Sequence, residues 1–315
     1  MNKALSVYQA KRKIGIFSYS LFRFLLLLGV CYLLLFPLFY LIISAIQDPA
    51  SMMDATVVWV PKALSASNFK TAFEQLNYVK SLGFTLALTL VSAFFTLISC
   101  SMAGYGLARF NFRGKNLVFI LVILIIIVPP QTTMMSTYLN FRFFSALGLT
   151  NLFGVESINM IGSPLTFYLP AILGNGIHSG LSIYIFRQFF LGQPRELEEA
   201  AKIDGCGIFR TYLQVMIPLS IPAIVTVAVF SIVWYWNDSF FSTILFSTDT
   251  HPLAVALKVL RDTFVSDVKN AQFTAQEQRG ILAAASILCV VPPLLLYTVI
   301  QRKFVESIEN SGIVG

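Results

Sequence analysis

The hydrophobic residues of this 315-residue chain are gathered into long blocks that contain no Asp, Glu, Lys or Arg. Six such blocks occupy residues 24–46, 81–108, 116–141, 157–186, 211–237 and 280–301. Each block meets or exceeds the roughly 20 residues that a helix needs to cross a hydrocarbon core about 30 Å thick. Inside a membrane only helices and closed barrels satisfy their own backbone polar groups, and residues 120–128 lack the alternation of a barrel strand. The pattern therefore predicts an all-α membrane protein with six transmembrane helices.

The fourth block is the least regular of the six, because Pro164, Pro170, Gly174, Gly176 and Gly180 interrupt it. Proline and glycine are tolerated at membrane depth where neighbouring helices or a cavity satisfy the freed backbone groups. The four-residue spacing of Gly176 and Gly180 would also allow another helix to approach closely. An outer loop that leads into a later helix explains the block equally well, so both interpretations stay open.

The basic residues indicate the orientation in the membrane. If the N-terminus is cytoplasmic, most of the 22 Lys and Arg residues fall on the cytoplasmic side, which is the usual bias. Both termini are then cytoplasmic. The predicted organisation is a cytoplasmic segment 1–23, a first membrane helix 24–46, an extracytoplasmic loop 47–80, a core of five membrane helices 81–302 and a cytoplasmic tail 303–315.

The first block has a basic leader, but it is too long for the apolar region of a signal peptide and no small-x-small cleavage site follows. We expect it to be a retained anchor. The net charge of +7 then reflects topology and contact with anionic membrane lipid. No basic cluster has a soluble domain of its own, so we expect no nucleic-acid partner.

Acidic residues gather in segment 191–216, between the fourth and fifth blocks. Glu196, Glu198, Glu199 and Asp204 lie there within nine positions, although the whole chain has only 15 acidic residues. Pro194 suits a first helical turn, and the three glutamates complement the positive end of a helix dipole. Gly205 can adopt the left-handed conformation that ends a helix, and Asp204 can cap the next one. We therefore predict two short cytoplasmic helices joined by a sharp bend.

The same segment offers small and apolar side chains at Leu197, Ala200, Ala201 and Ile203. An ordinary interfacial loop lying on the lipid is the plainer interpretation, but an anionic leaflet would repel the cluster of acids. A docking element for a cytoplasmic protein accounts better for the composition.

Residues 199–205 (EAAKIDG), followed by the apolar–proline pair at 217–218, resemble the EAA loop of ABC importer permeases. Residues 187–190 and 194–198 resemble the carbohydrate-importing branch, that of the maltose-type inner-membrane permeases. Stretches 103–115, 236–238 and 301–305 agree with the same family, so the resemblance extends from about residue 81 to the end of the chain.

The resemblance implies a type I ABC importer permease-like fold in the cell membrane of a prokaryote. It also implies a second homologous permease subunit, two ATP-binding cassette subunits and an extracytoplasmic solute-binding protein as partners. The chain itself would be non-catalytic and would hold no cofactor, because the partner ATPases would bind ATP and Mg. The residues that would couple the chain to the ATPases are Glu196, Glu199, Ala200, Ala201, Asp204, Gly205 and Pro218. Among them, Glu199 would pair with basic groups of the ATPase and Gly205 would make the bend.

Motifs for other chemistry are missing from the sequence. The pair Gly114-Lys115 resembles the end of a phosphate-binding loop, but Arg109 stands where its first glycine would be and Asn116 replaces Ser or Thr. The two histidines, His178 and His251, have no ligand at metal spacing, so we expect no metal site.

The end of the fifth block combines aromatic, amide and carboxylate groups, which suit a hydroxyl-rich sugar. We therefore consider Trp236, Asn237 and Asp238 as substrate-pathway residues. For the tryptophans taken singly, an aromatic belt at the membrane interface is the favoured interpretation. A gating or substrate role stays open for Asn237 and Asp238, since an acid at a membrane boundary does not by itself prove function.

The sequence thus favours a permease subunit that imports a sugar or oligosaccharide. Import of a non-sugar solute by the same architecture is the alternative within transport. A stand-alone secondary transporter or a membrane-embedded structural subunit would be a different class. The near absence of ionisable residues inside the blocks disfavours a proton-coupled carrier.

Overall fold

The computed structural model describes residues 2–48, 63–145, 157–246, 251–266 and 273–312. Over these residues the regular secondary structure is helical, and strand-like pairing is limited to two isolated bridges, Gln47 with Leu64 and Phe144 with Ile158. The chain divides into two compact units. The first comprises Met1–Glu74 and Phe264–Leu288, and the second comprises Gln75–Thr263 and Cys289–Gly315.

The first unit contains α1 (Asn2–Ile46) and most of α2 (Ser67–Gln75). Helix α1 is continuous, so the boundary predicted at residue 23 does not coincide with a break in secondary structure. The buried side chain of Asn68 donates to the carbonyl oxygens of Ala45 (3.1 Å) and Gln47 (2.9 Å). This amide satisfies two carbonyls at the end of α1, where the helix itself provides no donor.

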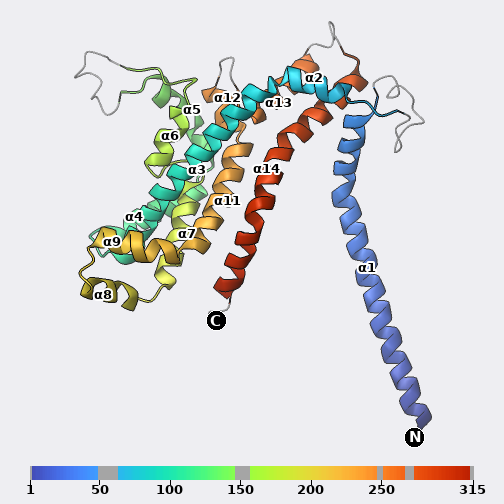
Figure 1. Ribbon diagram of the computed structural model, residues 1–315, viewed down its shortest axis with the longest axis horizontal. Coiled ribbons are helices and arrows are strands. Elements are labelled where there is room, and N and C mark those ends of the chain that lie inside the picture. Colours follow the sequence, from blue (N-terminus) through green and yellow to red (C-terminus); the bar gives the residue numbers. More distant parts are fainter. Residues whose placement is uncertain (1, 49–62, 146–156, 247–250, 267–272, 313–315) are drawn as a thin grey trace. The chain divides into compact units, whose positions relative to one another are not determined.

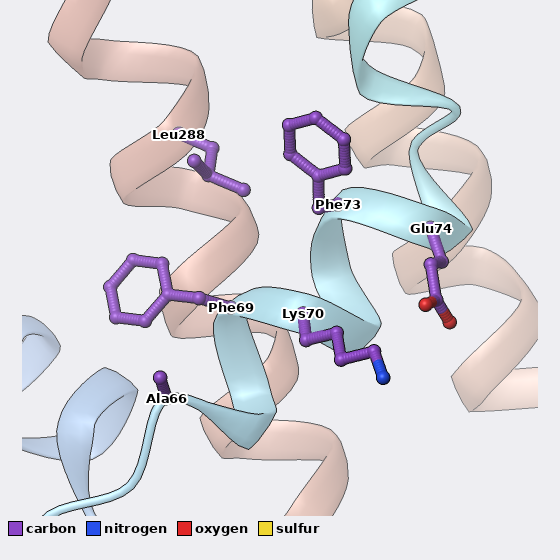
Figure 2. Close-up of a pocket in the computed structure, with 6 residues that line it drawn as sticks. All are labelled: Ala66, Phe69, Lys70, Phe73, Glu74 and Leu288. Atoms are coloured by element: carbon purple, nitrogen blue, oxygen red, sulfur yellow. The ribbon is translucent and has the colours of Figure 1, made fainter.

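A groove of about 370 Å³ lies beside α2 in this unit. It is lined by Ala66, Phe69, Lys70, Phe73 and Glu74, and by Leu288 of α14 (Ala275–Gly312). Phe69, Phe73 and Leu288 gather between the two helices, whereas Lys70 and Glu74 extend away (Figure 2). Because its exposed lining is almost wholly apolar, the groove offers a hydroxyl-rich solute few hydrogen-bond partners.

The second unit is built around the 32-residue helix α3 (Tyr78–Arg109) (Figure 1). It packs against α7 (Ser179–Gly192), α11 (Ile221–Asn237) and α6 (Leu165–Ile172). One face of α3 carries small hydroxyl side chains every three or four residues, all buried: Ser81, Thr85, Thr89, Ser92 and Thr96. Small residues let helix backbones approach closely in a membrane, where apolar burial alone does not drive association.

The four-residue spacing at Gly176 and Gly180 leads to two different contacts. A Cβ atom on Gly180 would lie 3.0 Å from the carbonyl oxygen of Val122 in α4 (Lys115–Ile127), so the predicted close helix approach is confirmed there. Gly176 precedes α7, and a Cβ atom on it would lie 2.3 Å from the hydroxyl of Tyr235. Gly176 therefore makes room for a side chain of α11 and for the backbone of α6, whose Ala171 Cα would lie 3.2 Å away.

Several of the predicted spans are broken. Helices α4 and α5 (Pro130–Arg142) meet at a bend of 102°, at the paired prolines 129–130. A second bend, of 78°, separates the segment Ile208–Leu219 from α11. The fourth block contains α6 and the first half of α7; these helices are 8 and 14 residues long and are separated by residues 173–178, where Gly174 and His178 have positive φ.

Consequently, among the described residues three single helices are long and apolar enough to cross a membrane, or up to five spans if each bent pair is one. They are Phe17–Ile46, Tyr78–Arg109 and Ala275–Thr298. The all-helical class is confirmed, whereas the count of six transmembrane helices is not. Proline removes a helix hydrogen bond, and glycine allows the positive φ at which the chain turns. These residues therefore end helices inside blocks that hydropathy alone predicts to be continuous.

The second unit has distinct ends. The short helices α8 (Glu196–Ile203) and α9 (Ile208–Thr211) lie beside the C-terminal ends of α3 and α7 (Figure 1). At the opposite end lie α5, α12 (Phe240–Leu245) and α13 (Leu253–Ser266). A buried cluster supports each end, one around Phe186, Phe190 and Tyr212 and the other around Phe167, Tyr235 and Phe246.

Candidate functional site

The predicted bend in segment 191–216 is present between α8 and α9. Gly205 has φ of +78°, its N–H donates to the carbonyl of Lys202 (3.0 Å), and the N–H of Cys206 donates to that of Ala201 (2.9 Å). These two bonds are those of a Schellman motif, in which a left-handed residue satisfies the last carbonyls of a helix. Gly205 therefore makes the bend, as its lack of a Cβ atom predicts.

Two details of the predicted bend are wrong. Asp204 is the C-terminal cap residue of α8 and does not cap the next helix, because α9 begins only at Ile208 with Gly207 as its N-cap. Pro194 lies before the helix rather than in its first turn, since Arg195 is the N-cap of α8. The bonds of the Schellman motif take in Gly205 and Cys206, so that Gly207, three residues after Asp204, occupies the N-cap position of α9.

The acidic side chains of α8 separate into two groups. All three glutamates occupy the first turn, where they complement the helix dipole. Glu196 and Glu199 are exposed, as is Asp204 at the other end of the helix. Glu198 instead turns toward α3, where its Oε1 lies 3.2 Å from Nε of Arg109. Glu196 and Glu199 thus face outward from the segment, whereas Glu198 pairs with Arg109 inside the unit.

The two alanines of the EAA stretch also face different ways. Ala201 is buried, whereas Ala200 is exposed beside Glu199. The outward surface is completed by large apolar side chains, since Ile203 is 87% exposed, Ile208 61% and Phe209 62%. An acidic and apolar surface of this kind is suited to a protein partner that offers basic groups around a hydrophobic pocket.

Pro218 lies where this segment enters the membrane helices. It belongs to the three-residue helix α10 (Ile217–Leu219), which follows a π-helical turn η3 (Tyr212–Met216). Proline has no N–H to donate, and the 78° bend follows immediately before α11. Pro218 is exposed and the buried Met216 anchors the turn, so this residue shapes the connection between the bent segment and α11.

The predicted pathway residues at the end of α11 have internal partners. Trp236 is buried, and its indole N–H donates to the carbonyl of Cys289 (3.1 Å). Asn237 is exposed, and its amide donates to the carbonyl of Val233 (3.0 Å). The substrate role of these residues stays a prediction.

Asp238 caps the start of α12. Its carboxylate accepts hydrogen bonds from the backbone N–H of Phe241 (3.3 Å) and from both the N–H and the hydroxyl of Ser242 (2.8 Å each). Burial raises the pKa of Asp238, and the hydrogen bonds from Ser242 and Phe241 oppose that rise. A charge held by three donors is stabilised without any solute.

Sequence reasoning missed Arg109 as a member of the site. Its side chain is buried at the end of α3 and contacts α8, and its Nη2 also donates to the carbonyl of Gln193 (2.7 Å). The available signal was the stretch 103–110 (AGYGLARF), in which an arginine ends a long apolar helix. In the described part of the chain no group of three or more His, Cys, Asp or Glu side chains could hold a metal ion.

These features define a class of protein: an all-helical protein with helices long and apolar enough to cross a membrane. A solved crystal structure of a bacterial ABC transporter involved in the import of the acidic polysaccharide alginate contains a chain of the same fold. The TM-score is 0.72 at 21% sequence identity, over 91% of this chain and 96% of that one. The bacterial alginate ABC transporter in complex with an alginate pentasaccharide-bound periplasmic protein gives a TM-score of 0.64 at 15% identity, over 90% and 92% of the two chains.

The chain belongs to the family described as the inner membrane component of binding-protein-dependent transport systems, whose model matches residues 96–310. The matched range includes α8, α9 and Arg109. This establishes a membrane transport component and agrees with the resemblance first seen in residues 199–205.

Curated relatives match over almost their whole length. The arabinooligosaccharides transport system permease protein AraQ of Halalkalibacterium halodurans is 27% identical over 290 residues, which are 91% of this chain and 93% of that protein. Protein LplC of Bacillus subtilis is 27% identical over 292 residues, 91% and 92% of the two chains. The diacetylchitobiose uptake system permease protein DasC of Streptomyces coelicolor is 24% identical over 287 residues, 90% and 92% of the two chains.

Proposed function

We propose that this chain is a transmembrane subunit of an ATP-driven importer that translocates a sugar or oligosaccharide delivered by an extracytoplasmic binding protein. The choice of a carbohydrate is supported by the named substrates of its relatives, which include arabinooligosaccharides and diacetylchitobiose. It is supported further by the fold shared with an alginate importer.

The observation that carries the proposal is the bent α8–α9 segment. It presents Glu196 and Glu199 together with the exposed apolar residues Ile203, Ile208 and Phe209 at one end of the second unit. Exposed apolar side chains in this number mark an interaction surface, and the acids give it charge complementarity to a basic partner. A cytoplasmic ATPase subunit is the partner that fits this surface.

In this assembly two ATP-binding cassette subunits bind ATP and Mg and hydrolyse the nucleotide, while this chain is non-catalytic. A second homologous permease completes the pathway across the membrane. Movement of the ATPases is delivered to α8 and α9 and then to α11 through the bend between Leu219 and Ile221. An extracytoplasmic binding protein supplies the solute at the opposite end of the unit.

The proposed topology has six spans in the cell membrane of a prokaryote, with both termini cytoplasmic. The bent pair α4–α5 counts as one span, α11 forms another beyond the 78° bend at its start, and α6 with α7 supplies the sixth by packing as two short helices along α3. The basic residues of segment 1–23, tail 303–315 and the α3–α4 turn then face the cytoplasm. Segment 191–216 faces the same side, which places the coupling surface within reach of the ATPases.

The test is purification of a tagged copy from its native membrane in mild detergent, with identification of what stays bound. We expect a second permease and an ATPase in the complex, and ATP hydrolysis in liposomes that rises when a binding protein loaded with an oligosaccharide is added. If only a binding protein loaded with a non-sugar solute stimulates ATP hydrolysis, the proposed substrate class is wrong and the importer assignment stands. Recovery of this chain alone, under conditions that keep other importers intact, would contradict the proposal and favour a stand-alone carrier.

A further inference from the structure

Three helix ends of the second unit converge on one guanidinium group. Arg109 is the last residue of α3, and its Nη2 donates to the carbonyl oxygen of Gln193, directly after α7 (2.7 Å). Its Nε lies 3.2 Å from Oε1 of Glu198, in the first turn of α8. Arg109 and Glu198 are only 4% and 13% exposed. One buried side chain therefore connects α3, α7 and α8.

A second residue of α3, Tyr105, anchors the core beside this pair. Tyr105 lies one helical turn before Arg109, so both side chains project from one face of α3. Tyr105 lies close to both Arg109 and Glu198. The ring of Tyr105 also packs against Phe190 of α7 (5.4 Å between centroids) and Tyr212 of η3 (5.1 Å). The pair of Arg109 and Glu198 thus lies beside a residue that is itself packed into the core.

The position of the pair at the helix ends strengthens it. A cation is stabilised at the C-terminus of α3, and an anion is stabilised in the first turn of α8. Because both groups are withdrawn from water, separating them would leave a buried charge without its partner. Glu196 and Glu199 are exposed on the same helical turn as Glu198. A force that a bound partner exerts on these two residues is therefore transmitted to Glu198 through one turn of helix.

We propose that Arg109 and Glu198 form a latch that makes α8 move as one body with α3 and α7. A push on the outer surface of α8 then displaces the membrane helices instead of being absorbed by the connection at residues 193–195. Arg109 and Glu198 are positioning residues, because neither lies on the outward surface. The inference rests on the proposed function, since a docked ATPase must supply the push.

The latch is tested by the ratio of solute taken up to ATP hydrolysed, measured on one preparation of the full complex in liposomes. The variants are Glu198→Gln, Arg109→Gln and the double variant. Each single variant is expected to retain its ATPase but to lower the ratio by roughly 2- to 30-fold, the range over which coupling networks respond to mutation. The double variant is expected to be no worse than either single variant, because the two residues act as a unit.

Arg113→Gln is the matched control, because Arg113 is exposed just beyond α3 and the ratio should stay at the wild-type value. A structural role alone would reduce the amount of complex without changing the ratio per complex. If these variants do not accumulate, Arg109→Lys keeps the charge but not the planar fork that reaches both Glu198 and the Gln193 carbonyl, and a ratio lowered by roughly twofold is expected.

The outcomes separate the two proposals. If the wild-type complex contains an ATPase and the variants keep the wild-type ratio of solute taken up to ATP hydrolysed, the latch is wrong and the importer stands. Additive effects in the double variant would also overturn it. A wild-type chain that never retains an ATPase would overturn both the latch and the importer.

Discussion

Gly104 of α3 and Phe186 of α7 lie so close that a Cβ atom added to Gly104 would be 2.6 Å from the Cβ atom of Phe186. The same atom would lie 2.9 Å from the backbone nitrogen of Arg187 and 3.2 Å from the carbonyl oxygen of Ile183. Two of these three neighbours are backbone atoms, so no side-chain rotation can make room. The crossing of α3 and α7 therefore requires glycine at position 104.

Gly104→Ala is expected to destabilise this crossing by about 1–3 kcal/mol, the cost of inserting a methyl group into a packed interior. The measurement is thermal unfolding of the purified chain in detergent, followed by size-exclusion chromatography. Gly83→Ala on the same helix is the control, because a Cβ atom there meets nothing within 4 Å. Since alanine favours a helix by about 1 kcal/mol over glycine, the control should be neutral or slightly stabilised. Equal melting temperatures for the two variants would contradict the close crossing.

Gly205→Ala tests the bend in the coupling segment. No atom lies within 4 Å of a Cβ at this position, so the cost comes only from the left-handed backbone at φ +78° and should be about 1–2 kcal/mol. We expect less ATPase to be retained on purification, while the chain still inserts in the membrane. Gly205→Asn should recover part of the loss, because asparagine visits this conformation more readily than alanine.

Gly207→Ala is the matched control for this bend. Gly207 has φ of −68° and open space around it, so alanine fits its backbone and ATPase retention should stay at the wild-type level. If the Gly207 variant also loses the ATPase, a methyl group is harmful at both positions, and the positive φ of Gly205 does not explain the effect of Gly205→Ala.

The contrast between Gly205 and Arg109 shows what the sequence could predict. The end of α8 depends on residues 201–206 alone, so the EAAKIDG pattern was sufficient to predict the bend. The contact between Arg109 and Gln193 joins residues 84 positions apart, and nothing local to either residue indicates it. Local backbone chemistry can be read from a sequence, whereas the partners of a buried charge depend on which helices meet.

The same distinction explains the broken spans. Prolines 129–130 and Gly174 were visible in the sequence, but a proline in an apolar block can either kink a helix or end it, depending on its neighbours. Gly180 was predicted to allow close approach, and the identity of its neighbour α4 came only from the structure. Hydropathy therefore located the apolar blocks but not the breaks within them.

Glu199→Lys tests the outward surface of α8. Glu199 is exposed, so reversing its charge leaves the fold intact and turns an attraction to a basic partner into a repulsion. Association with the ATPase should weaken by at least roughly tenfold, as measured by the ATPase retained at increasing dilution. Wild-type association should also fall as salt rises, because exposed charges are screened.

Asp262→Lys is the control for this reversal. Asp262 is an exposed acid on α13 whose 3.8 Å pair with the exposed Arg261 contributes little. Its reversal changes the net charge of the chain equally and should leave ATPase retention unchanged. An equal loss in both variants would indicate a general effect of charge rather than docking through α8.

Asp238 offers a final test, because its two roles, hydrogen-bond acceptor and negative charge, can be changed separately by substitution. The three hydrogen bonds from Phe241 and Ser242 make it the cap of α12. Asp238→Asn keeps one oxygen to accept the 2.8 Å bonds from Ser242 and gives up the longer 3.3 Å bond from Phe241, so its melting temperature should fall less than that of Asp238→Ala. Asp238→Ala loses the cap and should cost about 1 kcal/mol. If capping is the role of Asp238, solute uptake will follow stability and the asparagine variant will transport normally. A stable asparagine variant with impaired uptake would instead show that the charge itself acts on the solute, and the pathway role first predicted for Asp238 would then hold.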